Sequence, residues 1–158
     1  ADHGNVGLGE LAGVLAQIPL FAGFDRSKLK LLAFTSERVT HETGQYVFRQ
    51  GDSGDKAYVI LEGGVDVVLD TGVGDAVVAT LGQHQMFGEM ALLARIPRTT
   101  SIRASAPLTM VAIGQDVFSR LVEENANIAV GMARILAERL AGTLRDLGRA
   151  SARASSQT

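Results

Sequence analysis

The sequence predicts an α+β fold in which an antiparallel β-roll (a jelly roll) is preceded and followed in the chain by helices. Between residues 36 and 114, short runs rich in Val, Ile, Thr, Tyr and Phe alternate with turns made of Gly and Asp. Closely spaced strands of this kind are typical of two-sheet antiparallel folds. Before and after this region, apolar residues recur at the three- and four-residue spacing of helices.

The segment before the roll is predicted to form two helices. The first covers residues 10–17, where apolar residues share one face, and Pro19 then forces a turn. A second helix covers residues 28–34, with either Asp25 or Ser27 as its N-cap.

The roll itself is predicted to contain seven strands, each bounded by turn residues. They cover residues 37–42, 46–49, 56–62, 65–70, 76–81, 101–104 and 108–113.

The last third of the chain is predicted to be helical. Asp116 can cap a helix over residues 117–123, and the Asn-Ala-Asn sequence at 125–127 then breaks it. A second helix over 127–148 would be roughly 33 Å long at about 1.5 Å per residue, and Gly148 fits as its stop. One face of this helix carries an apolar stripe: Ile128, Met132, Ile135, Leu136, Leu140, Leu144 and Leu147.

Length and composition suit one globular domain. The chain has 158 residues, 46% of them hydrophobic and 20% charged, and a net charge of −2. We expect a single domain over 1–158, divided into N-terminal helices (10–35), the roll (36–114), C-terminal helices (115–148) and a flexible tail (149–158). Residues 1–9 are Gly-rich and are expected to be a loose leader, since their GNVGLG run lacks the strand that a dinucleotide-binding loop requires.

Composition also argues against several functions and locations. The small negative charge argues against a nucleic-acid-binding face, which usually carries a basic excess. There is no cysteine, no apolar run long enough to span a membrane, and no signal-peptide pattern. These features favour a cytoplasmic location.

The most informative stretch is FGEMALLARIPRTTSIRA, which begins at Phe87. Gly88 lets the backbone approach a ligand, Glu89 lies at the first turn of a short predicted helix, and Arg98 offers a planar fork of donors that matches a phosphate. The first amides of the short helix suit an anion. A carboxylate would repel a phosphate, so Glu89 requires a different partner, and a sugar hydroxyl is the natural one. Together these residues predict a ribose phosphate as ligand.

This stretch resembles the phosphate-binding cassette of the cyclic-nucleotide-binding domain family. The resemblance extends to the preceding run HETGQYVFRQGDSGDKAYVILEGGVDVV, which is similar to the first half of the family's roll. It implies a short phosphate-binding helix within a cassette over residues 87–101 and a long C-terminal lid helix. It also implies that Glu89 holds the ribose 2′-hydroxyl, and that Arg98 and the amides around Ala91 and Leu92 hold the cyclic phosphate.

The resemblance further implies that the C-terminal helix covers the base of the nucleotide. Arg139 resembles the lid arginine of channel domains, and Leu136, Leu140 and Leu144 would cover the base. Thr99 permits cyclic GMP as well as cyclic AMP without selecting either. The expected ligand-binding residues are therefore Phe87, Gly88, Glu89, Met90, Ala91, Leu92, Arg98, Thr99, Thr100, Arg139 and Leu140.

One departure from the family pattern lies just before the cassette, where a glycine is usual and the chain reads Leu81-Gly82-Gln83-His84. The sequence therefore does not predict the shape of this entry loop, although no ligand contact depends on it.

An enzyme is not expected. The three histidines, His3, His41 and His84, lack metal-ligand spacing, and no nucleophile elbow or phosphate-binding lysine loop is present. The expected role is a sensor that binds cyclic AMP or cyclic GMP, uses no metal, and signals to an effector protein or fused domain, with dimerisation as an open option. Two alternatives remain: a ligand-free scaffold or dimerisation domain, and the sensor half of a transcription regulator.

Overall fold

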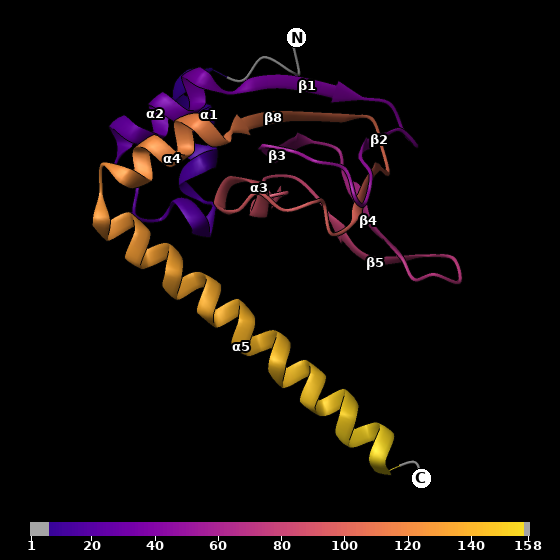
Figure 1. Ribbon diagram of the computed structural model, residues 1–158. Coiled ribbons are helices and arrows are strands. Elements are labelled where there is room, and N and C mark those ends of the chain that lie inside the picture. Colours follow the sequence, from indigo (N-terminus) through magenta and orange to yellow (C-terminus); the bar gives the residue numbers. More distant parts are fainter. Residues whose placement is uncertain (1–6, 157–158) are drawn as a thin grey trace.

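The computed structural model describes residues 7–156 and contains two four-stranded antiparallel sheets flanked by helices (Figure 1). One sheet has the strand order β1-β8-β3-β6 and the other β2-β7-β4-β5. The strands are β1 (Glu37–His41), β2 (Tyr46–Phe48), β3 (Lys56–Glu62), β4 (Val65–Asp70), β5 (Asp75–Leu81), β6 (Met86–Phe87), β7 (Ser101–Ala104) and β8 (Leu108–Gly114). The predicted β-roll is confirmed, and β6 is the one strand within it that was not predicted.

Strands β3 and β8 are buried on both faces, because one face packs against the second sheet of the roll and the other face packs against the helices. In β8, Leu108 and Met110 pack between the two sheets, whereas Val111 and Ile113 belong to the helical core. Successive side chains of a strand point to opposite faces, so a nearly continuous apolar run can serve two cores.

Helices α1 (Leu8–Ala16) and α2 (Arg26–Thr35) flank a 3₁₀ turn, η1 (Pro19–Phe21), as predicted around Pro19. Of the two predicted caps, Asp25 is the one used: its Oδ1 accepts a 2.9 Å hydrogen bond from the Lys28 amide. The rings of Phe21 in η1 and Phe24 in the loop after it pack on Phe118 of α4 (Gln115–Glu123).

The predicted capping of α4 by Asp116 is wrong. Strand β8 runs straight into the helix, so the N-cap position falls on Gly114, which has no side-chain cap. Asp116 lies two positions after the N-cap, inside the first helical turn.

Helix α5 (Ala126–Ser156) is longer than predicted. It passes through Gly148, so the predicted stop there and the predicted flexible tail are wrong as far as Ser156. A helical Gly costs about 1 kcal/mol relative to Ala, and the Ala and Arg residues that follow are strong enough helix formers to continue the helix. Residues 157–158, like residues 1–6 of the predicted leader, lie outside the described residues.

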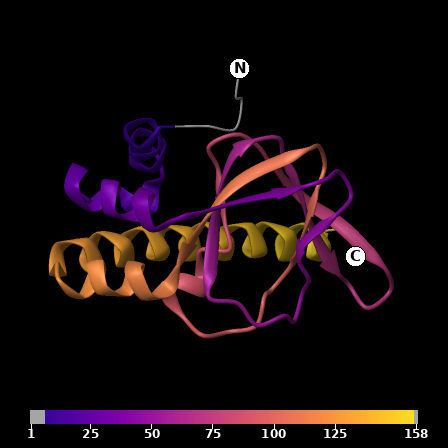
Figure 2. The same cartoon turned by 90° about the horizontal axis from the view of Figure 1, so that it is seen from above.

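The first turns of α5 belong to the core, and the rest of the helix projects from it. Ile128 and Met132 are buried against the helical core, whereas Leu140, Leu144 and Leu147 are each about 60% exposed. Figure 1 shows the helix leaving the roll as a long arm, and in Figure 2, seen from above, the same arm passes behind the strands of the roll.

The entry loop before the cassette is a tight turn. His84 adopts a left-handed conformation with φ of 66°, which explains why a glycine suits this position. Its amide donates a 2.7 Å hydrogen bond to the Ile60 carbonyl, which ties the loop to β3. The departure at His84 therefore leaves the turn intact.

Candidate functional site

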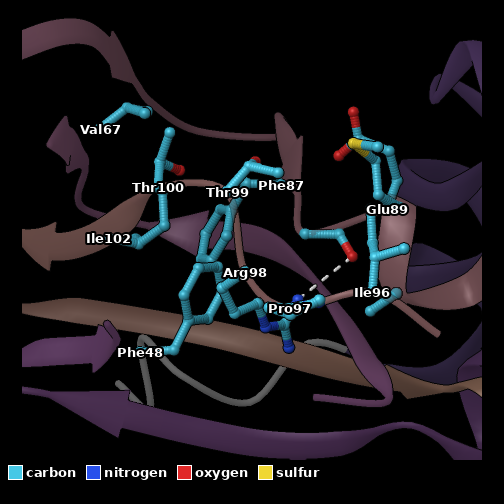
Figure 3. A pocket seen from close by; sticks show the side chains of 13 residues that line it. Phe48, Val67, Phe87, Glu89, Ile96, Pro97, Arg98, Thr99, Thr100 and Ile102 are labelled. Atoms are coloured by element: carbon cyan, nitrogen blue, oxygen red, sulfur yellow. Dashed lines mark hydrogen bonds between the residues drawn. The ribbon is translucent and has the colours of Figure 1, made fainter. Parts of the chain in front are cut away.

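A pocket of about 180 Å³ lies between the cassette and the inner faces of the strands (Figure 3). It is lined by Phe48, Val67, Phe87, Gly88, Glu89, Met90, Ala91, Ile96, Pro97, Arg98, Thr99, Thr100 and Ile102. The structure thus brings eight of the eleven predicted site residues to one pocket. Leu92, Arg139 and Leu140 do not line it.

Arg98 is the most unusual residue of the pocket because it is only 8% exposed. Its Nη2 donates to the Lys56 carbonyl at 2.9 Å and its Nη1 to the Gly88 carbonyl at 3.4 Å. Its Nε is buried without an acceptor, and no ion pair to a carboxylate is found within residues 7–156. Burial lowers the pKa of the Arg98 guanidinium, while Tyr58, Asp55 and Asp52 act in the opposite direction.

Two glycines make room for this guanidinium. A Cβ atom built on Gly54 would lie 2.4 Å from Nη2 of Arg98, and one built on Gly88 would lie 2.8 Å from Nη1. Gly88 also has a φ of 73°, which side chains rarely adopt. Any larger residue at these positions would push the guanidinium out of its place.

Glu89 occupies the N-cap position of the short helix α3 (Met90–Leu93), one residue before the predicted first turn. Its Oε1 accepts a 2.8 Å hydrogen bond from Nη1 of Arg139 on α5. The two side chains are 23% and 47% exposed. The cassette and the long C-terminal helix are therefore joined by an ion pair at the edge of the pocket.

The amides of Ala91 and Leu92, which were predicted to be available to an anion, already have acceptors. Ala91 donates to the Gly88 carbonyl at 3.1 Å, and Leu92 donates to the Glu89 carbonyl at 3.0 Å. Leu92 is buried in the helical core, so its side chain anchors α3 instead of lining the pocket. Among the predicted phosphate-binding groups, Arg98 keeps a side-chain donor, Nε, that has no acceptor within residues 7–156.

The predicted lid does not cover the pocket in this structure. Arg139 points to Glu89, and Leu140 is 60% exposed. Leu136 is 37% exposed and Leu144 is 59% exposed. A contact between these leucines and a base stays a prediction.

Sequence reasoning missed the apolar lining supplied by the strands and by the end of the cassette: Phe48, Val67, Ile96, Pro97 and Ile102. Phe48 lies in a run that resembles the family's roll, but nothing in the local pattern assigns it to a pocket. The Phe48 ring runs alongside Arg98, and Glu89 is set apart from both (Figure 3).

The family comparison agrees with the pocket's geometry. Residues 38–125, more than half of the chain, match the sequence model described as "Cyclic nucleotide-binding domain". The chain belongs to this family. This cyclic nucleotide-binding domain is similar in sequence or structure to several known proteins.

Three of these similar proteins are regulators. A "cAMP-dependent protein kinase regulatory subunit" of Schizosaccharomyces pombe is 30% identical over 69% of the chain. The N-terminal domain of a transcriptional regulator from Streptomyces coelicolor is 30% identical with a TM-score of 0.71, covering 82% of this chain and 94% of that one. The regulatory domain of Toxoplasma gondii PKA, solved with cAMP, is 27% identical with a TM-score of 0.66, covering 70% and 42%.

The chain spans only 26% of the length of the yeast kinase subunit. Within the described part of the chain, no helix is long and apolar enough to cross a membrane. No group of three His, Asp or Glu residues suited to a metal ion occurs among the described residues either.

Proposed function

We propose that this cyclic nucleotide-binding domain is a non-catalytic sensor of cyclic AMP that also accepts cyclic GMP. In the proposed complex, Arg98 binds the cyclic phosphate and Glu89 accepts a hydrogen bond from the ribose 2′-hydroxyl. The other cassette residues of the pocket surround the sugar and phosphate, from Phe87 to Ala91 and at Thr99 and Thr100.

The observation that carries this proposal is the buried Arg98 guanidinium, which has no ion-paired carboxylate among the described residues and lines the same pocket as Glu89. Burial of a cation among neutral partners is energetically unfavourable, so a protein that keeps one usually needs it for a function. An anionic ligand supplies the missing partner, and the planar guanidinium matches a phosphate with two parallel hydrogen bonds.

The pairing of Glu89 with Arg139, and not with Arg98, supports the proposal that Glu89 binds the ribose hydroxyl. An anionic side chain at the rim of an anion pocket would repel the ligand unless it accepts a hydrogen bond from it. Arg139 already offsets part of the charge of Glu89 through one carboxylate oxygen. An ionised carboxylate has about four acceptor positions, so Glu89 retains room for a hydroxyl donor.

The names of the similar proteins favour cyclic AMP. The yeast kinase subunit is called cAMP-dependent, and the Toxoplasma domain was solved with cAMP. Thr99 lines the pocket and can also reach a guanine amino group, as the family resemblance implies. We therefore expect cyclic GMP to bind as well.

The proposed output passes through α5 to an effector protein or a fused domain in the cytoplasm. The leucines of α5 would move onto the base when a nucleotide is present, so that the ligand shifts the population of helix positions. The exposed apolar face of α5 also leaves dimerisation through this helix open.

Calorimetric titration of the whole chain tests the proposal. We expect cyclic AMP to bind with a Kd below about 1 mM, equivalent to about −4 kcal/mol, and cyclic GMP to bind measurably. Adenosine, which lacks the phosphate, is the control and should bind far more weakly. Arg98→Ala should weaken cyclic AMP binding by roughly 10- to 150-fold, the equivalent of one hydrogen-bonded charge. Failure of both cyclic nucleotides to bind would favour a ligand-free scaffold.

A further inference from the structure

Within residues 7–156, the groups in direct contact with the Arg98 guanidinium are neutral, which is an uncommon environment for a buried cation. Buried charges are usually paired with an opposite charge. Here the guanidinium meets two backbone carbonyls on one side and an aromatic ring on the other. Asp52 and Asp55 influence Arg98 through their charge, but neither forms an ion pair with it.

The aromatic ring belongs to Phe48, at the end of β2. The guanidinium carbon of Arg98 lies 4.0 Å from the centre of this ring. Such a distance is well within the range of a cation–π interaction. Two further rings fix the position of Phe48: Phe87 at 5.9 Å and Tyr58 at 6.2 Å between centroids. The ring is therefore a rigid platform.

A neutral platform has a specific advantage for an anion site. A carboxylate in contact with Arg98 would hold it equally well, but it would compete with the phosphate for the same donors. A ring face attracts the guanidinium without occupying its N–H groups, because the attraction comes from the electron-rich face of the ring and not from an acceptor atom. The unpartnered Nε of Arg98 fits this arrangement, since one donor is kept without a protein acceptor.

We infer that Phe48 is the positioning residue that holds Arg98 ready for the phosphate, in place of a counter-ion. This inference rests on the proposed function, in which Arg98 binds the phosphate. It adds that the strength of phosphate binding depends on the aromatic face of Phe48, which belongs to β2 and not to the cassette.

The test compares three Phe48 variants in the whole chain by calorimetry with cyclic AMP and with cyclic GMP. Phe48→Leu and Phe48→Met remove the aromatic face and keep an apolar side chain, and each should raise the Kd about 3- to 30-fold, the range expected for a desolvated cation–π contact. Phe48→Tyr keeps the face and should remain within about threefold of wild type. The loss should be equal for the two nucleotides, because Phe48 acts through the phosphate-binding arginine and not through the base.

The same strand offers a matched control. Tyr46 lies two residues before Phe48, and the guanidinium carbon of Arg49 lies 3.9 Å from its ring centre. Arg49 does not line the pocket. Tyr46→Leu removes a comparable arginine–ring contact and should leave both Kd values within about twofold of wild type, since an exposed contact of this kind contributes little.

A second readout does not depend on the ligand. The Nε–H of Arg98 is buried in wild type, so its ¹⁵N-detected NMR signal should exchange slowly with water. In Phe48→Leu and Phe48→Met that exchange should accelerate, and in Phe48→Tyr it should not. Unchanged affinity and unchanged exchange in both aliphatic variants would overturn the inference, as would a loss confined to one base. If wild type bound neither nucleotide, the proposed function would fail, while the exchange rates would still decide whether Phe48 holds Arg98.

Discussion

The Glu89 carboxylate accepts a 2.8 Å hydrogen bond from Arg139, a residue fifty positions later in the chain. Glu89 belongs to the cassette and Arg139 to the long helix α5, so the proposed ribose contact is tied directly to the proposed output element. A nucleotide that engages Glu89 therefore changes the surroundings of Arg139 as well. This gives the ligand a physical route to α5 that does not depend on the exposed leucines.

Replacement of Glu89 by Gln should weaken binding of cyclic AMP but have much less effect on 2′-deoxy cyclic AMP. The amide is a poorer acceptor than the carboxylate, and a charge-assisted hydrogen bond is worth about 1.5–3 kcal/mol. Calorimetry with the two nucleotides measures the difference. Equal losses for both ligands would show that Glu89 does not contact the 2′-hydroxyl.

Arg139→Gln should release α5 from the cassette without unfolding the domain. The ion pair is partly exposed, so its loss should lower the free energy of unfolding by less than about 1 kcal/mol. In wild type, cyclic AMP should increase protection from hydrogen exchange both in residues 91–100 and in residues 135–147. In the variant, the cassette should still gain protection and α5 should gain little. Full protection of α5 in the variant would show that the leucines alone couple the helix to the ligand.

Arg98→Met should weaken nucleotide binding by the same roughly 10- to 150-fold as Arg98→Ala, while leaving the melting temperature at or above that of wild type. The lowered pKa of Arg98, caused by burial, means that folding disfavours its charged form. Since the guanidinium is charged at neutral pH in both states, its burial makes an unfavourable contribution to stability there. An apolar side chain of similar length removes that contribution. A large fall in melting temperature would show that the hydrogen bonds to Lys56 and Gly88 outweigh the cost of burial.

Gly54→Ala should reduce binding with little effect on folding. The added Cβ would lie 2.4 Å from Nη2 of Arg98, and the mobile end of that side chain is the group that must move. We expect a weaker affinity for cyclic AMP and an unchanged far-ultraviolet circular dichroism spectrum. The control is Gly82→Ala. A Cβ on Gly82 would have open space around it, and Gly82 does not have the positive φ that makes Gly72 unsuitable as a control. Gly82→Ala should therefore bind like wild type, and equal behaviour of the Gly54 and Gly82 variants would contradict the steric argument.

Thr99→Ala should weaken cyclic GMP binding more than cyclic AMP binding. The Thr99 side chain lines the pocket, and its hydroxyl is proposed to reach the guanine amino group in addition to the phosphate. One neutral hydrogen bond is worth about 0.5–1.5 kcal/mol, or roughly 2- to 12-fold in affinity. A competition titration measures the ratio of the two Kd values. The reverse order of losses would place Thr99 away from the base.

Local pattern was sufficient to predict much of the fold. The runs of strand-forming apolar residues at β3 and β8 and the helix spacing at the two ends follow from which residues can be buried together. Helix ends were less predictable: Asp116 lost the cap position to Gly114, and Gly148 did not stop α5. The start of α4 depends on where β8 ends, and the end of α5 depends on the summed helix propensity of the residues around Gly148. A single capping residue decides neither.

The sequence by itself determined the β-roll, the position of the cassette and the presence of Glu89 and Arg98 in it, because these depend on local spacing and on the chemistry of individual side chains. Only the tertiary structure decided what those side chains contact. Phe48 reaches Arg98 from β2, fifty residues earlier in the chain, and Arg139 reaches Glu89 from a helix fifty residues later. Such contacts depend on the packing of distant segments, whose relative positions are set by the whole core and not by any run of neighbouring residues.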